Sequence, residues 1–156
     1  IIVDWLRRFG SVEEALAEIC ALGRRGASIK ANLGDVGDVQ RLVAEGAGAL
    51  GGLDILVNNS GIEKHPAFQD VTERDFDAVL DVNLKGVFFA TQAFVRQCAG
   101  GRPGKVINVS SVHEEMAFPH FAAYCASKGG VRMLTRELEV APRTLISSWH
   151  RRKGMT

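Results

Sequence analysis

The chain has 156 residues, of which 19 are basic and 18 acidic, and a formal net charge of +1. A balance this even indicates a small-molecule substrate rather than nucleic acid or an acidic partner. The odd number of cysteines, without Cys-x-x-Cys spacing, argues against a disulfide framework or a zinc site. We therefore expect a protein of the reducing cytoplasm with no metal site, and no membrane partner because no apolar run approaches the ~18 residues of a span.

Short apolar runs alternate with amphipathic segments along the chain, which is typical of an α/β fold. We expect helices that begin after the capping residues Ser11, Asp35 and Thr72, and a further helix that contains Tyr124. The expected strands are residues 1–3, 27–31, 54–57 and 105–111. This order predicts a partial doubly wound parallel sheet with helices on both faces.

Tyr124 and Lys128 are four residues apart in the expected helix, which places a phenol and an ammonium on one face. A nearby ammonium favours the phenolate, so we expect the pKa of Tyr124 to lie below its ordinary ~10, as a proton-transfer catalyst needs. The alternative is a half-buried tyrosine beside a solvated lysine.

Polar residues follow two of the expected strands directly. Ser111 ends the apolar run after Gly104, and Asn58 and Gly61 come just after the strand at residues 54–57. The carboxyl ends of parallel strands form the crevice where open α/β sheets bind ligands. Asn83 interrupts an apolar helical stretch, where an amide is otherwise unfavourable. These residues are therefore candidates for one site.

The four motifs resemble those of the short-chain dehydrogenases/reductases in order and spacing, over about residues 1–140. They are Asn58-Asn59-Ser60-Gly61, Asn83, Ser111, and Tyr124 with Lys128. The resemblance implies a Rossmann-like fold and hydride transfer between NAD or NADP and a secondary alcohol or carbonyl. It also implies a homo-oligomer, a dimer or tetramer, in the full-length form.

The resemblance also implies a role for each site residue. Tyr124 would be the acid/base, Lys128 would lower its pKa and bind the nicotinamide ribose, and Ser111 would donate a hydrogen bond to the substrate oxygen. Asn83 would hold a water in the proton relay. Asn58 and Gly61 would line the cofactor cleft, and Asn32 and Leu33 would lie near the adenine.

Within the family, residues 61–66 and 110–114 look most like the glucose 1-dehydrogenase branch, which implies a sugar or polyol substrate. Glu63, His113 and Glu114 would then rim the substrate pocket, since a hydroxyl-rich substrate needs such acceptors. The alternative is that these three are ordinary exposed loop residues.

The choice between the two dinucleotides depends on the end of the first expected strand. Asp4 would favour NAD, whereas Arg7 and Arg8 would favour the 2′-phosphate of NADP, and the discriminating position falls on Trp5. We expect NADP or dual use.

The chain also departs from the family pattern. It has no Gly-rich turn of the kind that holds a cofactor pyrophosphate, and residues 143–156 resemble nothing in the family. We expect a partial cofactor-binding domain at residues 1–142 and a frameshifted or disordered tail without a strand. One alternative is therefore a truncated, catalytically silent fragment or interaction protein of the same fold. Another is the extended epimerase/dehydratase group, which shares the Tyr and Lys motif.

Overall fold

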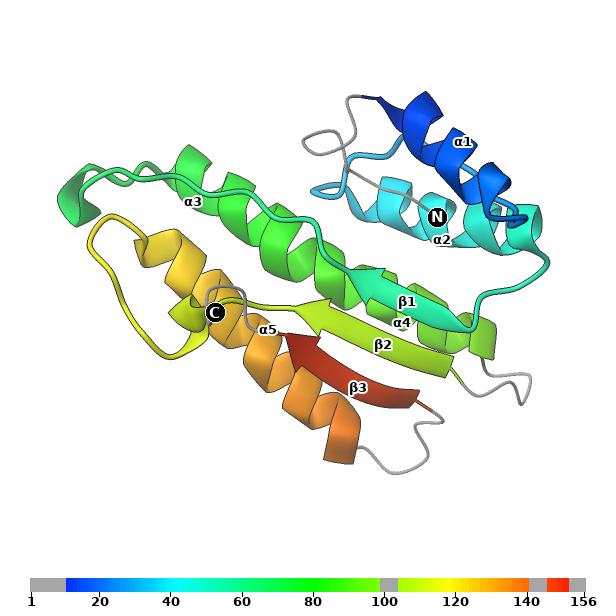
Figure 1. The fold of residues 1–156 in the computed structure, drawn as a ribbon. Helices are drawn as coiled ribbons and strands as arrows, with labels where there is room; N and C mark the ends of the chain where they lie inside the picture. Colours follow the sequence, from blue (N-terminus) through cyan, green and yellow to red (C-terminus); the bar gives the residue numbers. More distant parts are fainter. Residues whose placement is uncertain (1–10, 99–103, 141–145, 152–156) are drawn as a thin grey trace.

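The structure is a computed structural model. It describes residues 11–98, 104–140 and 146–151, the last range as backbone only (Figure 1). The expected strand at residues 1–3 and the dinucleotide-discriminating positions Asp4, Trp5, Arg7 and Arg8 lie outside these ranges. The helices are α1 (Val12–Ala21), α2 (Val36–Leu50), α3 (Glu73–Leu80), α4 (Val87–Cys98) and α5 (Ala122–Val140). The strands are β1 (Ile55–Asn58), β2 (Gly104–Val109) and β3 (Ile146–Arg151).

The described strands form one parallel sheet in the order β1-β2-β3. Ile55 is in register with Lys105, and Ile107 with Trp149. In Figure 1 the three strands point the same way, with α1 and α2 beyond the β1 edge. The fold class expected from the sequence, an α/β protein with a parallel sheet, is confirmed.

One face of the sheet packs on α4 and α5. Leu56 of β1 packs against the buried cluster of Phe94, Cys98 and Val106. Side chains alternate between the two faces of a strand, so Ile55 and Val57 point away from this cluster. They are 57% and 53% exposed, which leaves the opposite face of β1 uncovered in the described part of the chain.

The helix starts follow the local rules of capping. Ser11, Asp35 and Thr72 each accept a hydrogen bond from the backbone N–H three residues on, at 3.2, 2.8 and 3.1 Å. These bonds satisfy N–H groups that the first turn of a helix leaves unpaired. Gly51 ends α2 with a left-handed φ of 77°, which glycine adopts without strain. The predicted caps are therefore confirmed.

The segment from Glu73 to Cys98 is continuously helical, but its middle turns, Asp81–Gly86, are π-helical. The helix has a mean hydropathy of 1.3 over its most apolar window, so by length and composition alone it could cross a membrane. Asp81, Asn83 and Lys85 interrupt its sequence, so it is not the continuous apolar run of about 18 residues that the chain was expected to lack. The helix is nevertheless a core element of this fold, because Val79 and Phe94 are completely buried.

Two expectations about strands were also wrong. Residues 27–31 are irregular rather than extended into a strand, because a strand needs a neighbour to complete its hydrogen bonds and none of the described strands lies beside it. The tail, in contrast, contains β3, whose backbone pairs with β2 over six residues. Pairing with a preformed neighbour can impose a strand on a sequence with a weak local signal.

Candidate active site

Ser111 and Tyr124 meet at the carboxyl end of β2. Ser111 follows this strand and caps the 3-10 turn Val112–Glu114, where its Oγ accepts from the His113 N–H at 3.4 Å. Its hydroxyl lies close enough to the phenol of Tyr124, in the first turn of α5, to lower the pKa of that phenol by hydrogen bonding. Ser111 is only 7% exposed. The two hydroxyls are thus close enough to bind a single substrate oxygen.

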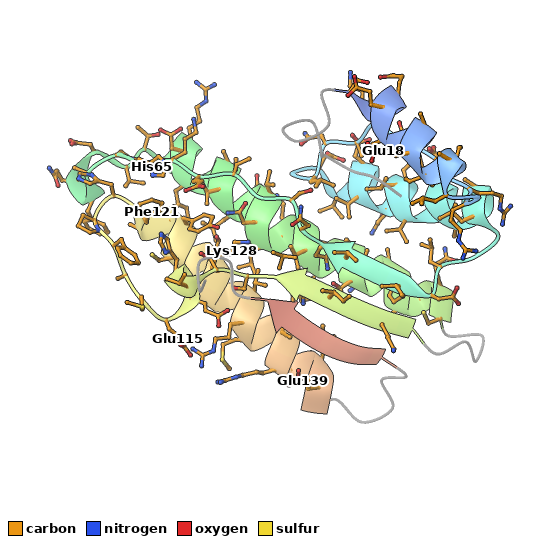
Figure 2. The ribbon with its side chains drawn as sticks, in the orientation of Figure 1. Glu18, His65, Glu115, Phe121, Lys128 and Glu139 are labelled. Carbon is orange, nitrogen blue, oxygen red and sulfur yellow. The ribbon has the colours of Figure 1, made fainter. Side chains whose placement is uncertain are left out.

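Lys128 lies one helical turn after Tyr124, on the same face of α5. Its Nζ is 5.6 Å from the centroid of the Tyr124 ring and donates to the Val109 carbonyl at 3.0 Å. The side chain is 4% exposed. Figure 2 shows Lys128 on the side of the sheet toward which the strand arrows point. The convergence of Ser111, Tyr124 and Lys128 predicted from their spacing is therefore present.

The pKa of Tyr124 is raised above its ordinary value of 10.0, so the expectation of a lowered pKa was wrong. Burial of the phenol is the largest cause, because a low-dielectric surrounding disfavours the charged phenolate. The hydrogen bond from Ser111 opposes this effect, and the nearby Glu63 and Cys125 add to it. The neutral phenol is therefore the favoured form.

Asn83 is fully buried in the π-helical turn and ties it to two other segments. Its Oδ1 accepts from the Ile62 N–H at 2.8 Å, and its Nδ2 donates to the Ile62 carbonyl at 2.9 Å and to Ser127 Oγ at 3.1 Å. Ser127 Oγ in turn donates to the Tyr124 carbonyl at 2.7 Å. The side chain thus holds the segment after β1 against the turn that carries Tyr124.

Gly61 lies where these segments approach one another most closely. A Cβ at this position would be 3.3 Å from Asn83 Oδ1 and 3.7 Å from Lys128 Nζ. A larger residue would therefore fill the space between the amide and the ammonium.

Four polar side chains form a hydrogen-bonded row across the helix-covered face of the sheet, which we call the amide row. Asn58 Nδ2 donates to Thr91 Oγ1 at 3.1 Å and to Asn108 Oδ1 at 2.8 Å, and Asn108 Nδ2 donates to Thr135 Oγ1 at 2.9 Å. The row links α4, β1, β2 and α5. Asn58, predicted to line the cofactor cleft, uses its amide here. The sequence did not single out Thr91, Asn108 or Thr135. Asn108 could have been noticed, because an amide inside an apolar strand needs a hydrogen-bond partner.

The predicted substrate residues occupy different environments. Glu63 is near enough to Tyr124 to raise its pKa, and it pairs with His65 at 3.6 Å when that imidazole is protonated. His113 stacks edge-on to Tyr124, with ring centroids 5.4 Å apart, and its buried Nδ1 has no hydrogen-bond partner among the described residues. Glu114 is only 9% exposed, so the alternative of an ordinary exposed loop residue was wrong for it.

His113 belongs to an aromatic cluster beside Tyr124. Its ring centroid is 4.5 Å from that of Phe121 and 4.9 Å from that of Phe118, and Phe121 also contacts His65 at 4.5 Å. Figure 2 shows His65 and Phe121 near each other beyond the carboxyl ends of the strands. This wall of rings is apolar except at the imidazole edges.

The predicted adenine residues lie in the loop before α2. Asn32 Oδ1 accepts from the Gly34 N–H at 3.1 Å, so the amide oxygen stabilises a local turn. Leu33 lines an apolar groove beside β1. No group of three or more His, Cys, Asp or Glu residues with the geometry of a metal site occurs within residues 11–98 and 104–140.

The comparisons with known proteins point to one family. The model of the family described as short chain dehydrogenase matches residues 1–144. Sepiapterin reductase of Chlorobaculum tepidum is 36% identical over 143 residues, which are 92% of this chain and 59% of that protein. A 3-oxoacyl-(acyl-carrier-protein) reductase, FabG, of Staphylococcus aureus is 40% identical over 130 residues, 81% of this chain and 53% of that protein.

Solved structures show the same fold. A short-chain alcohol dehydrogenase of Sinorhizobium meliloti superposes with a TM-score of 0.80 at 36% identity, over 85% of this chain and 52% of that one. A metagenomic short-chain oxidoreductase in complex with NADP superposes with a TM-score of 0.84 at 26% identity, over 93% of this chain and 68% of that one. The chain spans about half the length of the curated relatives it matches. From the family match and these relatives, the chain belongs to the short-chain dehydrogenase/reductase family.

Proposed function

We propose that this chain carries the proton-transfer site of an NAD(P)-dependent oxidoreductase acting on a secondary alcohol or carbonyl. The observation that carries the proposal is the approach of the Ser111 and Tyr124 hydroxyls, with the Lys128 ammonium over the Tyr124 ring, at the carboxyl ends of the strands. The small residue Gly61 between Asn83 and Lys128 fits a cleft that admits a flat ring. When bound, the nicotinamide would supply or accept the hydride.

In this proposal the hydroxyls of Ser111 and Tyr124 bind the reacting oxygen together. Ser111 orients the oxygen, and Tyr124 donates a proton to it during reduction or removes one during oxidation. The raised pKa favours the protonated phenol, which is the form that donates a proton during reduction. Lys128 would hold the nicotinamide ribose. Asn83 would keep the Tyr124 turn in place, and we also propose that it holds a water in the proton relay.

The finer substrate proposal is a sugar or polyol. Glu63 and His113 lie beside Tyr124, and their carboxylate and imidazole could accept or donate hydrogen bonds to several hydroxyls. The half-exposed Glu63 can reach solvent and a substrate from the same position. NADP or dual use remains our expectation for the cofactor.

A second candidate is reduction of a ketone with an apolar or aromatic body. The wall of His113, Phe118 and Phe121 favours it, because such rings bind flat or apolar groups. The curated relatives named above are reductases. The two candidates predict different rates with polyols and with aromatic ketones. These rates can be measured on the grafted enzyme that the next paragraph describes.

The test of the proton-transfer role uses residues 11–140 grafted into the corresponding part of the Staphylococcus aureus reductase. Tyr124→Phe should lower kcat by about 10²–10⁴-fold, the usual contribution of general acid/base catalysis, and leave dinucleotide binding unchanged. Lys128→Ala should lower kcat and also weaken dinucleotide binding. Gln97→Ala, an exposed amide on α4, is the control. Equal activity of Tyr124→Phe and the parent across pH would contradict the role.

We also propose that the full-length form is a homo-oligomer that acts in the cytoplasm without nucleic-acid or membrane partners. Phe88 on α4 and Met133 on α5 support an oligomer, since both are large apolar side chains at 45% and 59% exposure.

A further inference from the structure

The turn that leads into α5 has an unusual backbone conformation for its sequence. His120 has a φ of 69°, and in the part of the chain that the structure describes it is the one residue other than glycine with a positive φ. In this left-handed region a Cβ lies too close to the following carbonyl oxygen, so glycine is favoured there. Pro119 comes before it, and a proline followed by a residue with positive φ is typical of a type II β-turn. The turn therefore carries strain at His120.

This turn brings two aromatic rings to the same imidazole. Phe118 at its start and Phe121 at its end both contact His113, with ring centroids 4.9 and 4.5 Å away. The first and last residues of a β-turn lie within about 7 Å of each other, which lets both rings pack on one side chain. Phe121 also contacts His65, from the segment after β1, at 4.5 Å (Figure 2). The position of the Phe121 ring thus depends on the turn.

Phe121 and His113 are also ring neighbours of Tyr124. Both meet the phenol ring edge-on, with centroids 6.1 and 5.4 Å away. Burial is the largest cause of the raised pKa of Tyr124, and rings this close displace water from the phenol. A displaced Phe121 would therefore leave Tyr124 more hydrated.

The backbone of His120, rather than its imidazole, is the feature that matters for this placement. The side chain is exposed and borders Lys64 and Asp75, which form an ion pair at 3.4 Å. The ring contacts around Tyr124 come instead from His113 and Phe121. A residue that adopts the left-handed region should therefore replace His120 without moving Phe121.

We propose that His120 is a positioning residue for Tyr124, because its left-handed conformation holds the Phe121 ring against His113 and so keeps water away from the phenol. The contribution of this placement to proton transfer rests on the proposed function. The placement itself does not, since it can be measured on the chain without substrate or cofactor. Failure of the proposed function and failure of this proposal are therefore distinguishable.

The test follows the tyrosinate absorbance of Tyr124 in the full 156-residue chain while the pH is raised. Glycine and asparagine tolerate a positive φ, so His120→Gly and His120→Asn should keep the titration midpoint within about 0.2 pH unit of the parent. A β-branched residue is a genuine outlier there, so His120→Val should open the turn and lower the midpoint by at least about half a pH unit toward 10.0. The matched control Ala117→Val puts the same side chain at an exposed position of the same loop and should leave the midpoint unchanged.

A second substitution tests the ring itself with the turn intact. Phe121→Leu should lower the Tyr124 midpoint as His120→Val does, and the double variant should lower it no further, because both changes act through one ring. Circular dichroism over the same pH range checks folding, and Phe121→Leu decides the matter if His120→Val does not fold. An unchanged midpoint in Phe121→Leu would overturn the proposal. So would an equal fall in His120→Gly, which would assign the effect to the imidazole, or in Ala117→Val.

Discussion

Tyr124 shows how burial outweighs a neighbouring charge at the level of one residue. A lysine one turn away would lower the pKa of a solvated phenol, but here the Lys128 Nζ is 5.6 Å from the ring centroid and donates to the Val109 carbonyl. Desolvation and Glu63 act in the opposite direction, and the pKa rises. The protonated phenol is therefore the favoured form of Tyr124 in this structure.

Tyr124 is the only tyrosine in the chain, so its titration can be followed directly by tyrosinate absorbance. We expect a midpoint above 10.0, because the folded protein favours the protonated phenol. The associated stability is present below the ordinary pKa and is lost as pH rises through the higher folded value. Glu63→Gln should lower the midpoint of the Tyr124 titration, because it removes a negative charge that raises the pKa of the phenol. The control Glu45→Gln changes an exposed carboxylate paired with Arg41 and should not move this midpoint. A midpoint at or below the ordinary pKa would show that Lys128 dominates after all.

At the level of elements, the π-helical turn Asp81–Gly86 is the feature that assembles the site. It places Asn83 between Ile62 and Ser127, and so joins the segment after β1 to α5. π-helical turns occur often at functional sites. The amide row adds a second link between the same layers, from Thr91 of α4 to Thr135 of α5.

Asn83→Ala should destabilise the fold, because it leaves the partly buried N–H and carbonyl of Ile62 without their partners. Each unsatisfied group costs about 1–3 kcal/mol, so for the two groups we expect a loss of about 2–6 kcal/mol in the free energy of unfolding, measured with urea. The matched control Gln97→Ala removes an exposed amide and should change it by less than about 0.5 kcal/mol. A similar small effect of both variants would mean that Asn83 does not hold these segments together.

At the level of the whole molecule, the chain brings Ser111, Tyr124 and Lys128 together but spans only about half the length of its curated relatives. Among the described strands, only β2 pairs with β1, and an apolar groove lies beside the other edge of β1. Exposed strand edges promote association, so the isolated chain should be marginally stable and prone to associate. A catalytically silent chain or an interaction protein thus remains the alternative to an active enzyme.

We predict that the 156-residue chain alone binds neither NAD nor NADP tightly. A dinucleotide pyrophosphate carries two negative charges, which a Gly-rich turn at a helix N-terminus would neutralise, and the sequence contains no such motif. Calorimetric titration should detect no micromolar binding, with the metagenomic relative solved with NADP as the positive control. Micromolar binding of either dinucleotide would show that the cleft formed by these residues is sufficient.

Much of the fold was predictable because it depends on neighbours in the sequence. The caps at Ser11, Asp35 and Thr72 act on N–H groups three residues away. Periodicity located the helices, and apolar runs located β1 and β2. Residues 27–31 and β3 were mispredicted because strand formation depends on a partner strand, which lies far away in the sequence.

The sequence by itself determined the family, the parallel α/β class and the set of residues Asn83, Ser111, Tyr124 and Lys128, because motif order and helical spacing are properties of the chain. Tertiary structure decided the direction of the Tyr124 pKa shift, the burial of Glu114 and the use of Asn58 in the amide row. Each of these depends on which groups from distant segments exclude water around a side chain or complete its hydrogen bonds. No local pattern specifies those contacts, since desolvation and pairing are set only when the layers pack.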